Sequence, residues 1–132
     1  MSKCKDCDEN SKRPAPHPGP RCFSHHKEKL KRDEDRARDQ KYRKLYGITL
    51  DDYNRLYAFQ GGKCYVCRWA TGKTKYLAVD HDHETGEVRG LLCSRDNRMI
   101  GYARDNPEYF ERTAEYLRNP PYKRMREQDA GK

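Results

Sequence analysis

Carboxylates and imidazoles are concentrated in one short stretch of the sequence, "VDHDH", which contains Asp80, His81, Asp82 and His83. Hard divalent cations such as Mg2+ prefer oxygen ligands, and neutral histidine is a suitable base near neutral pH. Hydrolysis of a phosphodiester uses both, because a cation contacts the phosphate while a base deprotonates water. The stretch therefore predicts a hydrolytic site, and a solvated polar turn is the alternative for these residues taken alone.

The geometry of a strand limits how these side chains can cooperate. Alternate side chains of a strand point to the same face, so Asp80 and Asp82 would share one face. His81 and His83 would share the other. Asp80 and His81 can reach one phosphate only if the chain twists or bulges here, or if the substrate lies along the strand edge. Asn97, one turn into an expected helix, can add an amide oxygen to a metal bound by Asp80.

The cysteines offer a second kind of chemistry. Two pairs have C-x2-C spacing: Cys4 with Cys7, and Cys64 with Cys67. This spacing allows two thiolates to bind one tetrahedral zinc ion. The N-terminus has no apolar signal-peptide core, and cytosolic cysteines are usually reduced. We therefore expect zinc sites in preference to disulfides. A redox role is less favoured, because no βαβ pattern surrounds either pair.

The N-terminal segment predicts a complete zinc knuckle. Cys4 and Cys7 supply the first pair of ligands, and Cys22 with His25 supplies a second pair, spaced C-x2-H. His26 is the alternative to His25, and a Pro-rich loop, "RPAPHPGPR", joins the two pairs. We expect a zinc site because the segment has no other means of folding. A disordered basic tail with incidental cysteines is the competing interpretation.

Composition limits the size of the core and indicates the partner. Only 33% of the 132 residues are hydrophobic and 38% are charged, so the small core needs additional stabilisation, such as bound metal ions. The net charge of +8 and the ten tyrosines suit a nucleic-acid partner, although charge alone also fits a basic chain with no such partner. No apolar run approaches the ~18–20 residues of a membrane span, so we expect no membrane contact and a cytoplasmic location.

Helices and one hairpin are expected to position these residues. The charged segment 27–46 has opposite charges three and four residues apart, which predicts a solvated helix. Thr49 can cap a second helix that ends at Gly61–Gly62. "KYLAVDH" and "VRGLLC" predict two strands around an "ETGE" turn. Helices over 94–105 and 107–119 follow, the second with an apolar stripe and with a proline at its first position.

Three segments resemble the recombination endonuclease VII family of phage nucleases: "YGITLDDYNRLYAFQGGKCYVC", "LAVDHDHETGEVRGLLC" and "NRMIG". That family belongs to the HNH, or His-Me finger, nucleases. The resemblance covers residues 46–117 and implies a small, zinc-stapled α+β fold with a ββα-metal core, flanking helices and an N-terminal knuckle. The expected organisation is a zinc knuckle over 1–26, a charged helical connector over 27–46, a nuclease domain over 47–119 and a basic tail over 120–132.

The resemblance assigns catalytic roles to individual residues. It implies that Asp80 binds a catalytic Mg2+ or Mn2+ and that Asn97 completes this metal site. His81 would be the general base that activates water. His83 would orient or support the phosphate.

The core zinc site departs from the family pattern. The resemblance implies a structural zinc ion held by Cys64, Cys67, Cys93 and a fourth cysteine. Asp96 stands at that fourth position, in "CSRDN". A carboxylate can bind zinc at about 2.0–2.2 Å, so we expect a weaker Cys3Asp site. A degenerate site held only by packing is the alternative.

These residues together predict a metal-dependent DNA endonuclease. Arg89 and Arg98 flank the expected metal site and could contact DNA phosphates, with ordinary surface exposure as the alternative for both. The resemblance implies branched DNA such as a Holliday junction, and a homodimer acting in the cytoplasm of a phage-infected bacterium. Two other functions compete: an HNH nicking nuclease of phage DNA packaging or of a mobile element, and a non-catalytic zinc-stapled DNA-binding module.

Overall fold

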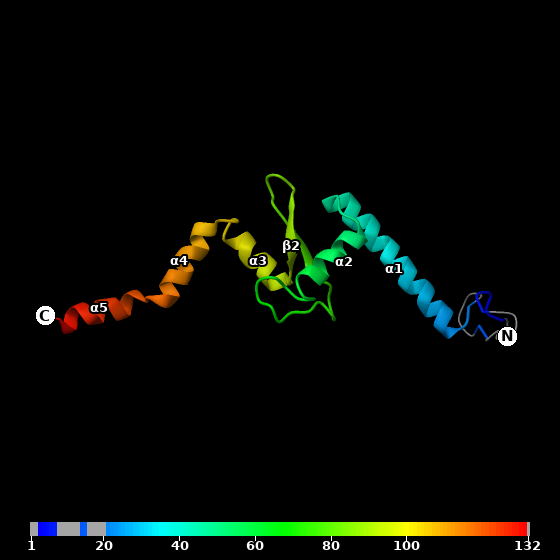
Figure 1. Ribbon diagram of the computed structural model, residues 1–132, viewed down its shortest axis with the longest axis horizontal. Helices are drawn as coiled ribbons and strands as arrows, with labels where there is room; N and C mark the ends of the chain where they lie inside the picture. The colour runs from blue at the N-terminus through cyan, green and yellow to red at the C-terminus, as the bar shows by residue number, and fades with distance from the viewer. Residues whose placement is uncertain (1–2, 8–13, 16–20, 132) are drawn as a thin grey trace. The chain divides into compact units, whose positions relative to one another are not determined.

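The computed structural model describes residues 3–7, 14–15 and 21–131, so most of the Pro-rich loop lies outside the described residues. The chain divides into two units, residues 1–55 and 56–132, and each is described by itself. The described residues form five helices and one two-stranded sheet, which makes the fold class α+β (Figure 1). The elements are α1 (Phe23–Tyr46), α2 (Leu50–Phe59), β1 (Ala78–His81), β2 (Val88–Leu92), α3 (Ser94–Tyr102), α4 (Pro107–Arg118) and α5 (Pro121–Ala130).

Helix α1 is held mainly by its own side chains, as the charge pattern predicts. Ion pairs between residues four apart run along it, including Lys31 with Asp35 at 3.0 Å. The helix begins at Phe23, earlier than the expected connector, because the ligand pair that precedes the connector lies at its first turn. It ends at Gly47, whose left-handed φ of 70° lets its N–H donate to the Arg43 carbonyl.

An aromatic stack joins the end of α1 to the start of α2 within the first unit. The rings of Tyr42 and Tyr53 lie 4.9 Å apart and nearly parallel, and both side chains are buried. The guanidinium of Arg38 lies over both rings, at 5.5 and 5.0 Å. The connector therefore has a small packed face at its C-terminal end, which its charged sequence did not reveal.

The predicted cap of α2 is confirmed. The Asp52 N–H donates to the Thr49 hydroxyl at 3.0 Å, and the Thr49 N–H donates to the Asp52 carboxylate at 2.9 Å. This reciprocal pair is a capping box. At the other end, Gly61 and Gly62 have φ of 74° and 73°, a left-handed conformation that glycine adopts readily.

The two strands form an antiparallel hairpin with one irregularity. Val79 pairs with Leu91 and Asp80 pairs with Gly90, but His81 pairs with Val88. Arg89 is therefore an extra residue on β2, a β-bulge opposite the step from Asp80 to His81. Bulges bend a strand and increase its local twist.

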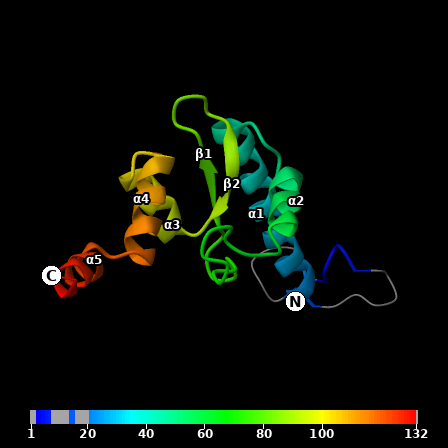
Figure 2. The same ribbon diagram turned by 60° about the vertical axis from the view of Figure 1, so that its left-hand side comes forward.

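The core of the second unit lies between the hairpin and α3. Leu77, Val79, Leu91 and Leu92 are buried, and Leu91 is fully enclosed. Helix α3 contacts both strands, so two antiparallel strands are followed directly by a helix that packs on them (Figure 2). This small apolar core agrees with the low hydrophobic content of the chain.

The side chain of Gln60 fastens the end of α2 to β2. Its amide oxygen accepts the Leu91 N–H at 2.8 Å, and its amide nitrogen donates to the carbonyls of Leu91 at 2.9 Å and of Lys63 at 3.0 Å. A Cβ atom at Gly90 would lie 3.2 Å from the Gln60 oxygen, so the close approach favours glycine. Gln60 thus satisfies backbone groups as a further strand would.

The C-terminal residues differ from expectation in two ways. The expected tail over 120–132 contains α5, because Pro121 occupies the first turn and Lys, Arg, Met, Glu and Gln follow. The apolar stripe of α4 is not buried, and Leu117 is 72% exposed. Among the described residues, none of the helices combines the length and apolar character needed to cross a bilayer.

Candidate functional site

The carboxylate of Asp80 is buried and faces a guanidinium. Asp80 is 7% exposed, and its two oxygens accept from Nε and Nη2 of Arg89 at 2.8 and 3.0 Å. The hydrogen bonds that Arg89 donates to Asp80 raise the pKa of Arg89 above its ordinary value. Arg89, which the sequence marked as a possible DNA contact, is exposed in the structure, and its guanidinium contacts the expected metal ligand.

A second carboxylate touches the same guanidinium. Nη1 of Arg89 lies 3.4 Å from Oδ2 of Asp105, in the segment between α3 and α4. Arg104 and Asp105 both have left-handed φ values, of 55° and 56°. No sequence motif marked Asp105, because its proximity to Arg89 depends on how the chain turns after α3.

The two histidines lie together on the hairpin. The rings of His81 and His83 are 4.9 Å apart at an interplanar angle of 61°, with His81 at the end of β1 and His83 in the turn that follows. His81 is half-buried and His83 is exposed. The bulge opposite His81 supplies the local twist that was required if Asp80 and His81 are to act on one phosphate.

Asp82 has a structural role that the sequence analysis missed. Its carboxylate accepts the N–H groups of Glu84 at 2.8 Å and Thr85 at 3.1 Å. Hydrogen bonds from these backbone groups, Thr85 first, lower the pKa of Asp82. The Gly86 N–H donates to the Asp82 carbonyl at 2.7 Å and closes the turn. Aspartate side chains in turns commonly bond to the backbone N–H two residues on, so this role was open to sequence reasoning.

Asn97 and Arg98 lie on α3, the helix that packs against the hairpin. The Asn97 N–H donates to the Cys93 carbonyl at 2.9 Å, which places Asn97 in the first turn, and its side chain is half-buried. Arg98 is exposed. The structure thus brings the helix bearing Asn97 against the strand bearing Asp80.

The core zinc ligands expected from the sequence come together. The donor atoms of this cluster all lie within 4.8 Å of one another, as ligands of one ion must, and the cluster consists of Cys64, Cys67, Cys93 and Asp96. Oδ2 of Asp96 lies 3.3 Å from Sγ of Cys64, and Asp96 is 4% exposed. Burial alone would raise the pKa of Asp96, but hydrogen bonds from the three thiols lower it. The donor set fits zinc, with a carboxylate in the fourth position.

The N-terminal ligands also converge. This cluster consists of Cys4, Cys7, Cys22 and His25. Nδ1 of His25 lies 3.3, 3.4 and 3.3 Å from the three sulfur atoms, so the structure selects His25 over His26. Burial opposes ionisation of Cys4, but backbone N–H groups and His25 outweigh it and lower its pKa to about 6. Zinc binds the thiolate form of cysteine, and this pKa makes Cys4 largely a thiolate at neutral pH.

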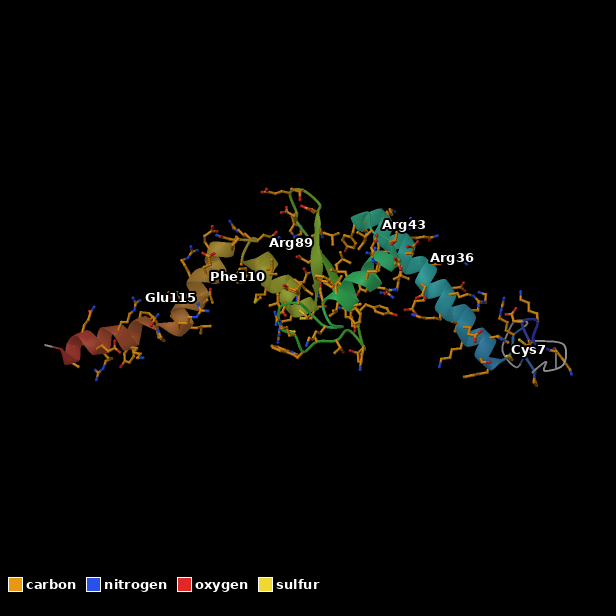
Figure 3. The ribbon with its side chains drawn as sticks, viewed as in Figure 1. Cys7, Arg36, Arg43, Arg89, Phe110 and Glu115 are labelled. Atoms are coloured by element: carbon orange, nitrogen blue, oxygen red, sulfur yellow. The ribbon has the colours of Figure 1, made fainter. Side chains whose placement is uncertain are left out.

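An apolar groove borders the carboxylate of Asp80. It encloses ≈ 710 Å³ between the end of α2, β2, α3 and α4, and Asp80, Arg89 and Asp105 form its polar wall. Phe59 and Phe110 are among its apolar lining residues, and Figure 3 labels Arg89 and Phe110. Sequence reasoning did not anticipate it, because its walls come from several elements that are separate in the sequence.

Comparison with known proteins adds independent information. A family model described as recombination endonuclease VII matches residues 39–119. The Gene 59 protein of Mycobacterium phage L5 is 49% identical over 122 residues, which cover 89% of this chain and 74% of that protein. The Gene 59 protein of Mycobacterium phage D29 is 48% identical over the same length and coverage. No solved structure matches the chain.

Proposed function

Because the chain belongs to the recombination endonuclease VII family, we propose that it is an HNH-type, metal-dependent endonuclease that hydrolyses phosphodiester bonds of DNA. The observation that carries the proposal is the hairpin and helix within the matched residues. A buried carboxylate at Asp80 is followed by the histidine pair, and α3 with Asn97 packs against them. We assign this unit as the ββα-metal core.

The proposed catalytic cation is Mg2+ or Mn2+, held by Asp80 and Asn97. The donors are oxygens, which hard cations prefer, and the Asp80 carboxylate already attracts a cation, the Arg89 guanidinium. When bound, such an ion would polarise the phosphate and stabilise the leaving oxygen. Residues 47–119 would form the nuclease domain, with structural zinc in the core cluster and in the knuckle over 1–26.

His81 is the proposed general base. Its imidazole nitrogen takes a proton from water, the water oxygen forms a bond to phosphorus, and the bond from phosphorus to the 3′-oxygen breaks. His83, with its ring 4.9 Å from that of His81, would orient the phosphate. Arg98 is exposed on α3 and would contact a neighbouring phosphate.

The proposed substrate is branched DNA, cut by a homodimer. The net charge of +8 would supply sequence-independent affinity that weakens with salt. The family description names recombination, in which branched DNA is the characteristic intermediate. The relatives are mycobacteriophage proteins, which supports action in the cytoplasm of a bacterial host.

A cleavage assay tests the proposal. The wild-type chain is incubated with Mg2+ and either a supercoiled plasmid or a four-way junction, alongside His81→Ala and the matched control His26→Ala. Loss of a general base should lower the cleavage rate by about 10²–10⁴-fold, while the control should cut normally.

Two results would contradict it. Intact substrates with wild-type protein in both Mg2+ and Mn2+ would exclude nuclease activity and favour a DNA-binding module. Equal rates for wild type and His81→Ala would exclude His81 as the base. Comparison of the junction with linear duplex DNA separates a branch-specific enzyme from a nicking nuclease.

A further inference from the structure

At Asp80, the guanidinium of Arg89 takes the place that a metal cation would need. Its two N–H groups donate to the two carboxylate oxygens at 2.8 and 3.0 Å, a bidentate arrangement that uses both oxygens of the proposed metal ligand. An arginine side chain stays protonated in proteins, so it cannot leave by losing its charge. A divalent ion can approach Asp80 only if this guanidinium releases at least one oxygen.

The β-bulge explains how Arg89 reaches this position. In a regular ladder Arg89 would stand opposite His81, but here it is the extra, unpaired residue next to Gly90, the partner of Asp80. Gly90 has no side chain to compete for the space. The contact between Arg89 and Asp80 therefore follows from the register of the two strands.

Asp105 is a second carboxylate that the Arg89 guanidinium can bind. Its Oδ2 is already 3.4 Å from Nη1 of Arg89, while its Oδ1 is buried and has no hydrogen-bond partner among the residues that the structure describes. An unsatisfied buried carboxylate oxygen is unfavourable. Left-handed backbone conformations at Arg104 and Asp105 hold this carboxylate in place, and strained conformations of this kind concentrate at functional sites.

We propose that Arg89 is a two-position switch that holds the Asp80 carboxylate in the metal-free protein and transfers to Asp105 when a divalent cation binds Asp80. In the second position the guanidinium would satisfy Oδ1 of Asp105, and Asp80 would exchange one cation for another. Arg89 is thus a positioning residue, and Asp105 stabilises its released form. The inference rests on the proposed role of Asp80 as the ligand of the catalytic metal.

The switch makes two opposite predictions for metal affinity. Arg89→Gln removes the competing cation, so Mn2+ should bind more tightly. Asp105→Asn removes the receiving carboxylate, so Mn2+ should bind more weakly. Each shift should fall between about five- and 150-fold, the range of coupling between two sites. Asp105→Asn should have no effect in an Arg89→Gln background, because no guanidinium is left to receive.

The experiment measures Mn2+ binding to the full, zinc-loaded chain by electron paramagnetic resonance of the free ion. Asp80→Ala identifies the site, and it should abolish this binding. Arg112→Gln on α4 and Asp129→Asn on α5 are matched controls with exposed side chains, and both should bind as wild type does. Thermal unfolding gives a second measurement: Arg89→Gln should lower the stability of the metal-free protein, and Mn2+ should raise it by more than in wild type.

The outcomes separate the switch from the proposed function. Unchanged affinity in Arg89→Gln, or an equal effect of Asp105→Asn with and without Arg89, would overturn the switch while cleavage by the wild type still supports the nuclease. Absence of any Mn2+ binding that depends on Asp80, together with absence of cleavage, would overturn both.

Discussion

A carboxylate among three cysteines would give a zinc ion in the core cluster a distinct environment. Asp96 is buried beside Cys64, with its Oδ2 3.3 Å from Sγ, and the thiols lower its pKa. An ionised carboxylate keeps the charge of the site less concentrated on soft sulfur, which zinc binds strongly. As a fourth ligand, Asp96 would therefore set how firmly the cluster retains zinc.

Replacing Asp96 should change zinc retention in both directions. Asp96→Cys completes a Cys4 site and should slow the release of core zinc to a chelator. Asp96→Ala leaves three ligands and should lose that zinc, which is followed by elemental analysis and by a zinc-sensitive dye. Ser94→Cys is the matched control, because it adds a thiol outside the ligand position. Release from Asp96→Cys at the wild-type rate would show that Asp96 is not a ligand.

The sequence predicted the members of both zinc clusters, because ligand identity and spacing are local properties. It did not show that Asp105 approaches Arg89, or that Asp82 closes the hairpin turn rather than being solvated. The Asp82 role was a missed local signal. The Asp105 contact depends on the turn after α3, which short-range patterns do not determine.

At the scale of elements, the hairpin is stabilised by a helix end. Gln60 bonds to both backbone groups of Leu91, a fully buried residue of β2. A two-stranded sheet is only marginally stable by itself, so an added partner along its edge matters. Gln60 also donates to the Lys63 carbonyl, so the same side chain holds the chain just before Cys64 of the core cluster.

Gln60→Leu tests this connection. The Leu91 N–H would lose its acceptor while remaining buried, so the free energy of unfolding should fall by about 1–3 kcal/mol. Urea denaturation of the zinc-loaded protein measures the change. Gln40→Leu, at an exposed position of α1, is the matched control. If the two variants are equally stable, the Gln60 contact does not support the hairpin.

Most helices and the hairpin were predictable, since caps, glycines and charge spacing act over a few residues. The capping box at Thr49 and the stop at Gly61–Gly62 are examples. The β-bulge and the Gln60 bridge were not predictable: the bulge depends on how the two strands align, and Gln60 bonds to Leu91 far along the chain, which no local pattern identifies. Helix α5 was missed because exposed charged residues fit a tail and a helix equally well.

At the scale of the whole molecule, the two zinc clusters belong to different units. The N-terminal cluster lies in residues 1–55 and the core cluster in residues 56–132. Each has four donor atoms within 4.8 Å of one another. Neither cluster shares a ligand with the other, so their metal ions should be bound independently.

Removing a ligand in one unit should therefore remove only that unit's zinc ion. Wild type should contain two zinc ions per chain by elemental analysis, and Cys22→Ser should contain one. Hydrogen exchange at Val79 and Leu91 should be unchanged in Cys22→Ser, because the core cluster keeps its ligands. Faster exchange at these amides would show that the units depend on each other. Ser24→Ala is a nearby control that leaves all four ligands in place.

The amphipathic pattern of α4 indicated an apolar face, yet a pattern does not say what covers it. Tyr109 and Leu117 are exposed in the structure. Periodicity reports only the arrangement of side chains around a helix.

The extra residue on β2 has a consequence for how relatives of this protein are compared. Deleting Arg89 would leave Asp80, His81 and all eight zinc ligands in place, and an alignment would still score the chain as a family member. The ladder would become regular, however, and the twist beside the histidines would be lost. A gap of one residue on β2 is thus more informative about activity than many substitutions.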